Sequence, residues 1–420
     1  MDKFIIQGGR KLEGVVEIAG AKNASLALMP AALLTGNVCT LHHTPRLRDI
    51  TTMSRLLESM GVEIHQKDSS LALDCNAIRN FEAPYELVKQ MRASFYVLGP
   101  LLARYGLAKV SYPGGCAWGP RPVDLHLEGL KKLGAEIEID AGYVVAKTQR
   151  LHGARIAFDV SSVGATGNVL MAATLAKGTT LIQNAAVEPE ITHLAQFLAR
   201  MGARIEGIGT SALEIQGVDD LHGAEDENIP DRIEAGTFLV AAAMTKGRVT
   251  IQRCNPEHVS SLLVKLEDAG CAISFGENSI TLTGPESIQP VDVTTAIHPG
   301  FPTDMQAQWI AFMSIASGTS TITDSIYLDR FNHVPELQRL GAKIKMVENA
   351  AIVQGVTHLS GAKVMSTDLR ASASLVLAGL IAEGTTEVLR VYHIDRGYET
   401  IEKKFIALGA NITRVRGEEY

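Results

Sequence analysis

The sequence predicts an α/β protein built from six copies of one unit of about 70 residues, arranged as two lobes of three units. Two series of glycines predict this repeat. In the first, an amphipathic helix ends at a glycine and a strand follows; in the second, an Ala-rich helix, a glycine and a strand come in the same order. The glycines are Gly61, Gly134, Gly202, Gly270, Gly341 and Gly409 in the first series, and Gly36, Gly106, Gly178, Gly247, Gly318 and Gly384 in the second. Because both series have the same period, we infer a repeat.

The elements of one unit follow from its apolar spacing. In residues 53–60 and 194–201, apolar side chains recur at i, i+3, i+4 and i+7, the pattern of an amphipathic helix. The glycine after each helix suits a left-handed C-terminal cap. Pro189 is expected in the first turn of its helix, where a missing N–H costs nothing. Two short strands then follow, as at 203–207 and 212–217, before a second helix and another strand.

The two ends of the chain predict how the lobes close. The sixth unit stops at residues 411–416 without the last strand that the other units carry, and residues 4–9 resemble that missing strand. Residues 1–21 would then belong with 230–420 in a C-terminal lobe of three repeats. Residues 22–229 would form the N-terminal lobe. A cleft between two such lobes is a favoured place for a small-molecule site.

Composition excludes several classes of protein. With 46% hydrophobic and 20% charged residues, the 420-residue chain is typical of a globular protein. The formal net charge is -7 without a Lys/Arg-rich block, which argues against nucleic-acid binding. The longest apolar run, residues 375–382, is too short to span a membrane, and the N-terminus has no signal-peptide core, so we expect a cytoplasmic protein. The five widely spaced cysteines favour neither disulfides nor a zinc site.

The loop at residues 113–122, PGGCAWGPRP, departs from the repeat pattern. It contains Cys116 and, five residues later, Arg121. An exposed thiol beside a cation is a candidate nucleophile or acid, since nearby positive charge lowers the pKa of a thiol. The alternative is a small apolar residue in a turn. For the other four cysteines, which lie in apolar segments, we expect only a packing role.

Charged residues at element ends form a second departure. Asp304, in HPGFPTD, is either an N-cap of the following helix or a general base. Lys22 at a helix start is electrostatically unfavourable unless an anion joins it. Further candidates are the segments TDLR (367–370) and HIDRGYE (393–399). The cations that could meet an anionic ligand in this acidic chain are Lys22, Arg92, Arg121, Arg370 and Arg396.

The order of motifs along nearly the whole chain resembles the enolpyruvyl transferase family, in particular the members that act on UDP-N-acetylglucosamine. The motifs are GAKN (20–23), MRAS (91–94), PGGCAWGPRPVDLH (113–126), SVGAT (162–166), EPEI (188–191), DRIEAGTF (231–238), HPGFPTDMQAQ (298–308), RFNHVPEL (330–337), TDLRASASLVLAG (367–379) and HIDRGYE (393–399). The sequence departs from the family pattern at Val160, where a basic residue can stand, and at Leu328, where an acidic one can. Both departures concern nucleotide contacts and not the chemistry.

The resemblance implies a fold of two inside-out α/β barrels, each with three βαβαββ units. It implies transfer of the enolpyruvyl group of phosphoenolpyruvate to the 3-hydroxyl of UDP-N-acetylglucosamine with release of phosphate, by addition and elimination in the cleft. This is the first committed step of bacterial peptidoglycan synthesis, on which cell shape and division depend. The alternatives are an enolpyruvyl transferase acting on shikimate 3-phosphate and a catalytically silent paralogue that binds UDP-sugars.

The resemblance also assigns site residues. Cys116 would be the proton donor, Asp304 would take the proton of the sugar hydroxyl, and Lys22, Arg121 and Arg396 would hold phosphoenolpyruvate. Asp368 and Arg370 would support the site. The UDP-sugar would be bound by Asn23, Arg92, Pro122, Val123, Asp124, Leu125, Ser162, Val163, Gly164 and Ile326. No metal or organic cofactor is implied, and the sequence does not indicate an oligomeric state.

Overall fold

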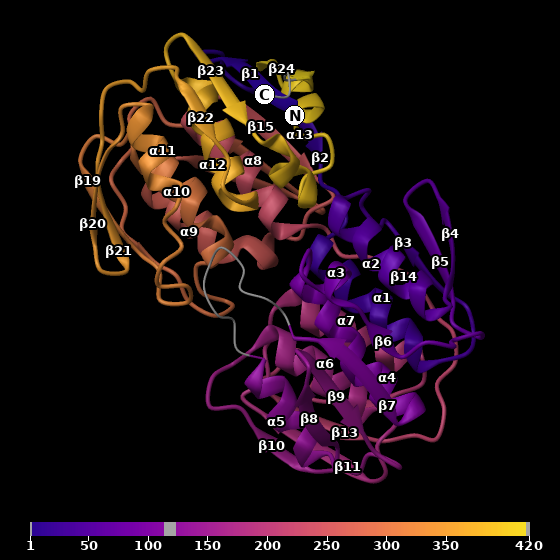
Figure 1. Ribbon diagram of the computed structural model, residues 1–420. Helices are drawn as coiled ribbons and strands as arrows, with labels where there is room; N and C mark the ends of the chain where they lie inside the picture. The colour runs from indigo at the N-terminus through magenta and orange to yellow at the C-terminus, as the bar shows by residue number, and fades with distance from the viewer. Residues whose placement is uncertain (1, 113–122, 417–420) are drawn as a thin grey trace. The chain divides into compact units, whose positions relative to one another are not determined.

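The computed structural model describes residues 2–112 and 123–416. By the contacts within the chain these divide into two compact units (Figure 1). Unit 1 consists of Met1–Ala19 and Pro230–Tyr420, and unit 2 is Gly20–Ile229. Each unit is described by itself below.

The described residues of unit 2 form twelve strands, and these strands and the helices between them are arranged in three repeats. The strands are β3 (Cys39–His42), β4 (Glu63–Lys67), β5 (Ser70–Asp74), β6 (Glu82–Ala83), β7 (Leu107–Ser111), β8 (Glu136–Asp140), β9 (Tyr143–Lys147), β10 (Arg155–Ala157), β11 (Thr179–Gln183), β12 (Arg204–Glu206), β13 (Ala212–Gln216) and β14 (Glu225–Glu227). The helices and 3-10 turns are α1 (Lys22–Ala31), η1 (Ala32–Leu34), α2 (Arg48–Met60), α3 (Tyr85–Val88), η2 (Arg92–Val97), α4 (Leu98–Tyr105), α5 (Asp124–Lys132), α6 (Val163–Ala173) and α7 (Pro189–Arg200).

The described residues of unit 1 form the same number of strands as those of unit 2. Its strands are β1 (Asp2–Gln7), β2 (Glu13–Glu17), β15 (Arg248–Gln252), β16 (Ala272–Gly276), β17 (Ser279–Thr283), β18 (Val293–Thr294), β19 (Thr319–Thr323), β20 (Lys343–Val347), β21 (Ala350–Gln354), β22 (Lys363–Met365), β23 (Thr385–Leu389) and β24 (Asn411–Arg416). Its helices and 3-10 turns are α8 (Arg232–Met244), η3 (Pro256–Val259), α9 (Ser260–Asp268), η4 (Thr303–Met305), α10 (Gln306–Met313), α11 (Val334–Arg339), α12 (Leu369–Ile381), η5 (Val391–Arg396) and α13 (Ile401–Ala407).

Each repeat forms one four-stranded sheet, which confirms the predicted βαβαββ unit. In the second repeat of unit 2 the order is β6-β7-β9-β8, with β6 and β7 parallel and the other neighbours antiparallel. The other five sheets repeat this order: β14-β3-β5-β4, β10-β11-β13-β12, β2-β15-β17-β16, β18-β19-β21-β20 and β22-β23-β1-β24. Among the described residues these sheets are separate and are not hydrogen-bonded into one closed barrel. The barrel character comes from packing around shared helices.

Strands from distant parts of the chain complete three of the sheets. β1 lies antiparallel between β23 and β24, with Phe4 opposite Val388 on one side and Arg414 on the other. Figure 1 shows the indigo β1 next to the yellow β24. β2 pairs in parallel with β15, and β14 pairs in parallel with β3. Each unit therefore depends on pairing between segments far apart in the sequence.

The cores lie between helices and sheets. Nearly every side chain of α6, α8, α10 and α12 is buried, whereas α2 and α7 bury one face only. Strands alternate buried and exposed residues, as in β11 and β15. Helices that are apolar all round are buried on all sides, so sheets surround central helices in each unit. This is the inside-out arrangement of the predicted fold class.

The backbone conformation agrees with the sequence features that predict the repeat. All six glycines of the first series have positive φ, between 94° and 106°, a conformation that favours glycine because it lacks a Cβ atom. Pro189 is the first residue of α7, as predicted. Within the described residues no helix is both long enough and apolar enough to cross a bilayer.

Candidate active site

In unit 1 the carboxylate of Asp304 lies between two arginines. Its Oδ2 accepts a hydrogen bond from Arg370 Nη2 at 2.7 Å, and its Oδ1 accepts one from Arg330 Nη1 at 2.8 Å. The side chain of Asp304 is 26% exposed, and those of Arg370 and Arg330 are 6% and 10% exposed. Asp304 caps no helix, since neither η4 nor α10 has a side-chain cap. The alternative of a capping role is therefore wrong.

The two arginines determine the charge of Asp304. Burial would raise the pKa of its carboxyl group, but Arg370 and Arg330 hold that pKa well below its ordinary value. Burial alone would lower the pKa of the Arg370 guanidinium. The nearby Asp304 and Tyr398 outweigh this effect, so the pKa of Arg370 is raised. Asp304 is thus a carboxylate throughout the physiological pH range, held by charge-assisted hydrogen bonds.

A chain of hydrogen bonds connects this carboxylate to the segment that carries Ile326. Arg330 Nη1 also donates to Thr303 Oγ1 at 3.2 Å, and Thr303 Oγ1 donates to Asp324 Oδ2 at 2.7 Å. The other carboxylate oxygen of Asp324 accepts the backbone N–H of Ile326 at 3.0 Å. The predicted nucleotide-contacting Ile326 is therefore held in the same polar network as Asp304.

The first turn of α12 is fixed by its own cap. Asp368 Oδ1 accepts the backbone N–H of Arg370 at 2.8 Å and of Ala371 at 3.1 Å. Arg370 Nη1 lies 3.4 Å from the hydroxyl of Tyr398, which follows Arg396, the last residue of η5. Asp368 thus positions Arg370, and Arg370 links α12 to the segment that carries Arg396.

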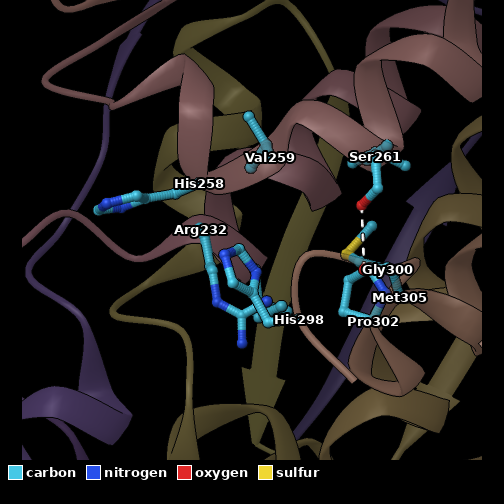
Figure 2. Close-up of a pocket in the computed structure, with 10 residues that line it drawn as sticks. Arg232, His258, Val259, Ser261, His298, Gly300, Pro302 and Met305 are labelled. Atoms are coloured by element: carbon cyan, nitrogen blue, oxygen red, sulfur yellow. Dashed lines mark hydrogen bonds between the residues drawn. The ribbon is translucent and has the colours of Figure 1, made fainter. Parts of the chain in front are cut away.

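A small hollow in unit 1 adjoins the loop before η4 (Figure 2). Residues of α8, η3, α9 and the segment 298–305 line it. Ser261 Oγ donates to the carbonyl oxygen of Gly300 at 3.1 Å, which fastens this loop to the first turn of α9. Figure 2 shows the side chains of Arg232 and His298 next to each other at the hollow. Polar side chains, among them Arg232, His258 and His298, therefore line this hollow together with apolar ones.

In unit 2, Lys22 is the first residue of α1 and pairs with a carboxylate. Its Nζ lies 3.1 Å from Asp49 Oδ2, and the two side chains are 11% and 5% exposed. Asp49, in the first turn of α2, is one anion that offsets the unfavourable position of a lysine at a helix start. The next residue, Asn23, is exposed. The first turn of α1 holds no acidic residue and has no side-chain cap.

The N-terminus of α6 carries the three predicted residues Ser162, Val163 and Gly164. Ser162 caps the helix, its Oγ accepting the backbone N–H of Ala165 at 3.3 Å. The hydroxyl of Tyr96 donates to the carbonyl oxygen of Val163 at 3.4 Å. No acidic residue stands in the first turn of α6. Such a helix end favours an anion, because its first backbone N–H groups lack partners in the helix.

His126 connects this helix end to the other predicted binding residues of unit 2. Val123, Asp124 and Leu125 directly precede it at the start of α5. Burial is the main cause that lowers the pKa of His126, and the positive charge of Arg92 lowers it further. The ring of His126 also lies against Gly164. The structure thus gathers Arg92, residues 123–125 and residues 162–164 around one histidine.

Three predicted site residues, Cys116, Arg121 and Pro122, lie outside the described residues. The other four cysteines are free and buried. Burial raises the pKa of Cys75 and Cys271 to about 12, that of Cys254 to about 11, and that of Cys39 as well. These four thiols stay protonated near neutral pH and are poor nucleophiles.

The described site residues therefore form two groups, one in each unit. The group in unit 1 is Asp304, Ile326, Asp368, Arg370 and Arg396, and the group in unit 2 is Lys22, Asn23, Arg92, Val123, Asp124, Leu125, Ser162, Val163 and Gly164. Sequence reasoning missed Arg330 and His126. Both lie within motifs quoted above, Arg330 at the start of RFNHVPEL and His126 at the end of PGGCAWGPRPVDLH, but nothing in the sequence indicates their contacts.

Comparison with known proteins gives one family throughout. A family model described as EPSP synthase (3-phosphoshikimate 1-carboxyvinyltransferase) matches residues 6–405. Two relatives named UDP-N-acetylglucosamine 1-carboxyvinyltransferase, from Chloroherpeton thalassium and Chlorobium limicola, are each 58% identical over 423 aligned residues. The alignments cover 100% of this chain and 99% and 100% of the relatives.

Solved structures agree on the fold. The enolpyruvyl transferase NikO from Streptomyces tendae has a TM-score of 0.90 at 25% identity, covering 99% of each chain. EPSP synthase from Acinetobacter baumannii has a TM-score of 0.77 at 18% identity, covering 99% of this chain and 100% of that one. At this identity, the similarity to EPSP synthase shows only that the fold is shared.

Proposed function

The chain belongs to the EPSP synthase family of enolpyruvyl transferases, and we propose that it transfers the enolpyruvyl group of phosphoenolpyruvate to the 3-hydroxyl of UDP-N-acetylglucosamine. Phosphate is the second product. The observation that carries the proposal is the 58% identity over the full chain to relatives named for this reaction. The acceptor shikimate 3-phosphate is the weaker alternative, because EPSP synthase from Acinetobacter baumannii is only 18% identical to this chain.

The reaction requires an acid and a base. The sugar oxygen attacks C2 of phosphoenolpyruvate while C3 gains a proton, and the resulting tetrahedral ketal then loses phosphate and a proton from C3. In this proposal Cys116 supplies the proton to C3, and Asp304 accepts the proton of the sugar hydroxyl. A positioned acid or base contributes about 10²–10⁴-fold to the rate of such a step.

The contacts of Asp304 support a role as a base whose pKa changes when a substrate binds. Two arginines keep it ionised, which is the form that accepts a proton, but they also keep its pKa low, which makes it a weak base. An anionic substrate that draws Arg370 or Arg330 toward itself would raise the pKa of Asp304. In this proposal substrate binding therefore strengthens the base at the moment it is needed.

Cations and neutral donors would bind the two substrates. Lys22, Arg121 and Arg396 would hold the phosphate and carboxylate of phosphoenolpyruvate, with Asp368 and Arg370 in support. The N-terminus of α6 with Ser162–Gly164, together with Arg92 and residues 123–125, would hold the UDP-sugar; the convergence of these residues in unit 2 supports this role. We also propose a place in bacterial peptidoglycan synthesis and a cytoplasmic location, as the sequence leads us to expect.

Phosphate release tests the proposal. Incubated with phosphoenolpyruvate, the purified chain should release phosphate with UDP-N-acetylglucosamine and not with shikimate 3-phosphate. Asp304→Asn, which keeps the shape but not the basicity, should lower kcat at least about 100-fold. The control Asp329→Asn alters an exposed carboxylate beside Arg330 and should keep nearly full activity. No release from folded wild type would overturn the proposal, and full activity of Asp304→Asn would remove the proposed base.

A further inference from the structure

His126 is a buried histidine that the proposed mechanism does not use. It lies in the first turn of α5, directly after the predicted binding residues 123–125, and is 5% exposed. Its imidazole packs edge-to-face with Phe95, at a ring separation of 5.2 Å and an angle of 86°. The ring is thus held in one orientation between α5, η2 and α6.

The contacts of Asn168 determine which nitrogen of His126 carries the proton. The side-chain oxygen of Asn168 accepts the backbone N–H of Gly99 at 2.7 Å, and its Nδ2 donates to the carbonyl oxygen of Phe95 at 2.9 Å. A backbone N–H can only donate and a carbonyl oxygen can only accept, so these two bonds fix the orientation of the amide. The remaining hydrogen of Nδ2 faces His126 Nδ1 at 3.0 Å.

His126 Nδ1 must therefore accept, and the proton of the neutral ring must be on Nε2. Burial, with a further contribution from Arg92, lowers the pKa of His126 to about 3. The ring is consequently neutral at physiological pH, with Nε2–H as a fixed donor. Among the described residues, no hydrogen bond to Nε2 is found.

The Nε2 edge of the ring faces the N-terminus of α6. A Cβ atom added to Gly164 would lie 2.8 Å from His126 Nε2 and 2.9 Å from its Cε1. Gly164 is the second residue of an 11-residue helix whose first turn holds no acidic residue. An Nε2 donor on a mostly buried ring, with no hydrogen bond to it among the described residues, and a helix start that favours anions thus meet at one place.

We propose that His126 is a further binding residue, which donates Nε2–H to a phosphate oxygen of the nucleotide diphosphate at the N-terminus of α6. This inference rests on the proposed function and names the group that recognises the diphosphate. A neutral donor can form a directed hydrogen bond with an anion. Unlike a cationic donor, it carries no charge that the protein would have to compensate when the site is empty. Asn168 is the positioning residue that keeps the proton on Nε2.

Two substitutions of His126 distinguish the role of Nδ1 from the role of Nε2. His126→Asn places an amide where Nδ1 was and removes the group at Nε2. His126→Gln reaches as far as Nε2 and retains a donor there. A hydrogen bond to a charged group contributes enough that its loss should weaken binding about 10- to 100-fold. We therefore expect UDP to bind His126→Asn 10- to 100-fold more weakly than wild type, and His126→Gln within about fivefold of wild type.

Calorimetric titration with UDP and with uridine tests this, because uridine has no phosphate. The affinity for uridine should be the same in wild type and both variants. Kinetically, His126→Asn should raise KM for UDP-N-acetylglucosamine by the same factor and leave KM for phosphoenolpyruvate unchanged. Unchanged UDP affinity in His126→Asn, or an equal loss for uridine, would overturn the inference.

A measurement on wild type covers the case in which a variant does not fold. Nitrogen-15 NMR of the imidazoles should show His126 with a protonated Nε2 and an unprotonated Nδ1, and UDP should shift the Nε2 signal. A proton on Nδ1, or no shift with saturating UDP, contradicts the inference. Phosphate release by wild type distinguishes the two proposals: an active enzyme with an unresponsive His126 refutes only this one, whereas a folded chain that releases no phosphate refutes the proposed function on which this one rests.

Discussion

The two units place different residues at equivalent helix starts. In unit 1, α8 and α12 are capped by the carboxylates of Asp231 and Asp368, each accepting two backbone N–H groups. In unit 2, the matching α1 has no side-chain cap, and α6 has the neutral Ser162. A carboxylate cap satisfies the N–H groups and the positive end of the helix dipole from within the protein. One fold thus provides carboxylate-capped helix starts at α8 and α12 of unit 1 and starts without a carboxylate cap at the matching α1 and α6 of unit 2.

The same contrast holds for the side chains nearby. Unit 1 presents Asp304 between Arg330 and Arg370, a carboxylate held between two cations. Unit 2 presents neutral donors at α6, namely His126 and the backbone around Ser162. Removing one member of this ion cluster leaves a partly buried charge with fewer partners, whereas removing a neutral donor affects mainly the ligand. The predictions below separate these two kinds of effect.

Removing Arg370 should have the largest effect. Arg370→Leu leaves Asp304 with only one of its two arginines, so the free energy of unfolding should fall by about 3 kcal/mol, the low end of the range for broken buried pairs. Chemical denaturation measures this. The control Arg339→Leu removes an arginine that is 57% exposed and should cost less than about 1 kcal/mol. Adding Arg330→Leu to Arg370→Leu should lower the free energy of unfolding further, because Asp304 then keeps neither arginine; no further loss would contradict a carboxylate held by both cations.

The buried histidines should make both units sensitive to acid. Burial lowers the pKa of His126 in unit 2 and of His333 in unit 1 to about 3, with a smaller contribution from a nearby arginine in each case. Between pH 6.5 and 3 the unfolded chain binds protons at these positions and the folded chain does not, so stability falls as pH falls, by about 1.4 kcal/mol per pH unit for each histidine.

Replacing either histidine should make this pH dependence shallower. Comparing the free energy of unfolding at pH 7 and pH 5, we expect His126→Gln and His333→Gln each to lose about 2 kcal/mol less than wild type. The exposed His358 provides a control, since His358→Gln should follow wild type. Equal slopes for all four proteins would show that neither ring is kept neutral by the fold.

Exchanging the caps should give the smallest effect. Ser162→Asp adds a carboxylate where unit 1 has one, so α6 keeps its cap but repels an anion, and the affinity for UDP should fall about tenfold. Asp231→Ser makes the opposite exchange at α8 and should leave UDP affinity unchanged. Calorimetry of both variants decides the comparison. If both changed UDP affinity equally, the difference between the helix starts would have no bearing on anion binding.

The repeat could be predicted from the sequence because its signals are local. A helix that ends at a glycine with positive φ can be predicted from a few adjacent residues. Gly61 and Gly202 could therefore be identified as helix ends without knowledge of any tertiary contact. The surroundings of Asp304 could not be predicted in this way. Its partners Arg330 and Arg370 lie 26 and 66 residues away, so their meeting depends on how α10 and α12 pack.

His126 illustrates the same limit at shorter range. Its position after residues 123–125 is visible in the sequence, but its proton is placed by Asn168, 42 residues away. No periodicity or composition reveals a tautomer. For Lys22, likewise, the sequence indicated that an anion was needed, and only the fold identifies Asp49 as a partner.

The pairing of β1 with β24 has a consequence for folding during synthesis on the ribosome. Residues 2–7 must wait for residues 411–416 before their sheet can form, a delay of about 20–80 s at typical translation speeds. Unit 2, encoded without interruption between Gly20 and Ile229, can acquire its structure while the remainder is still being synthesised. Unit 1 is the last to be finished, so a nascent chain holds its first strand unpaired until translation ends.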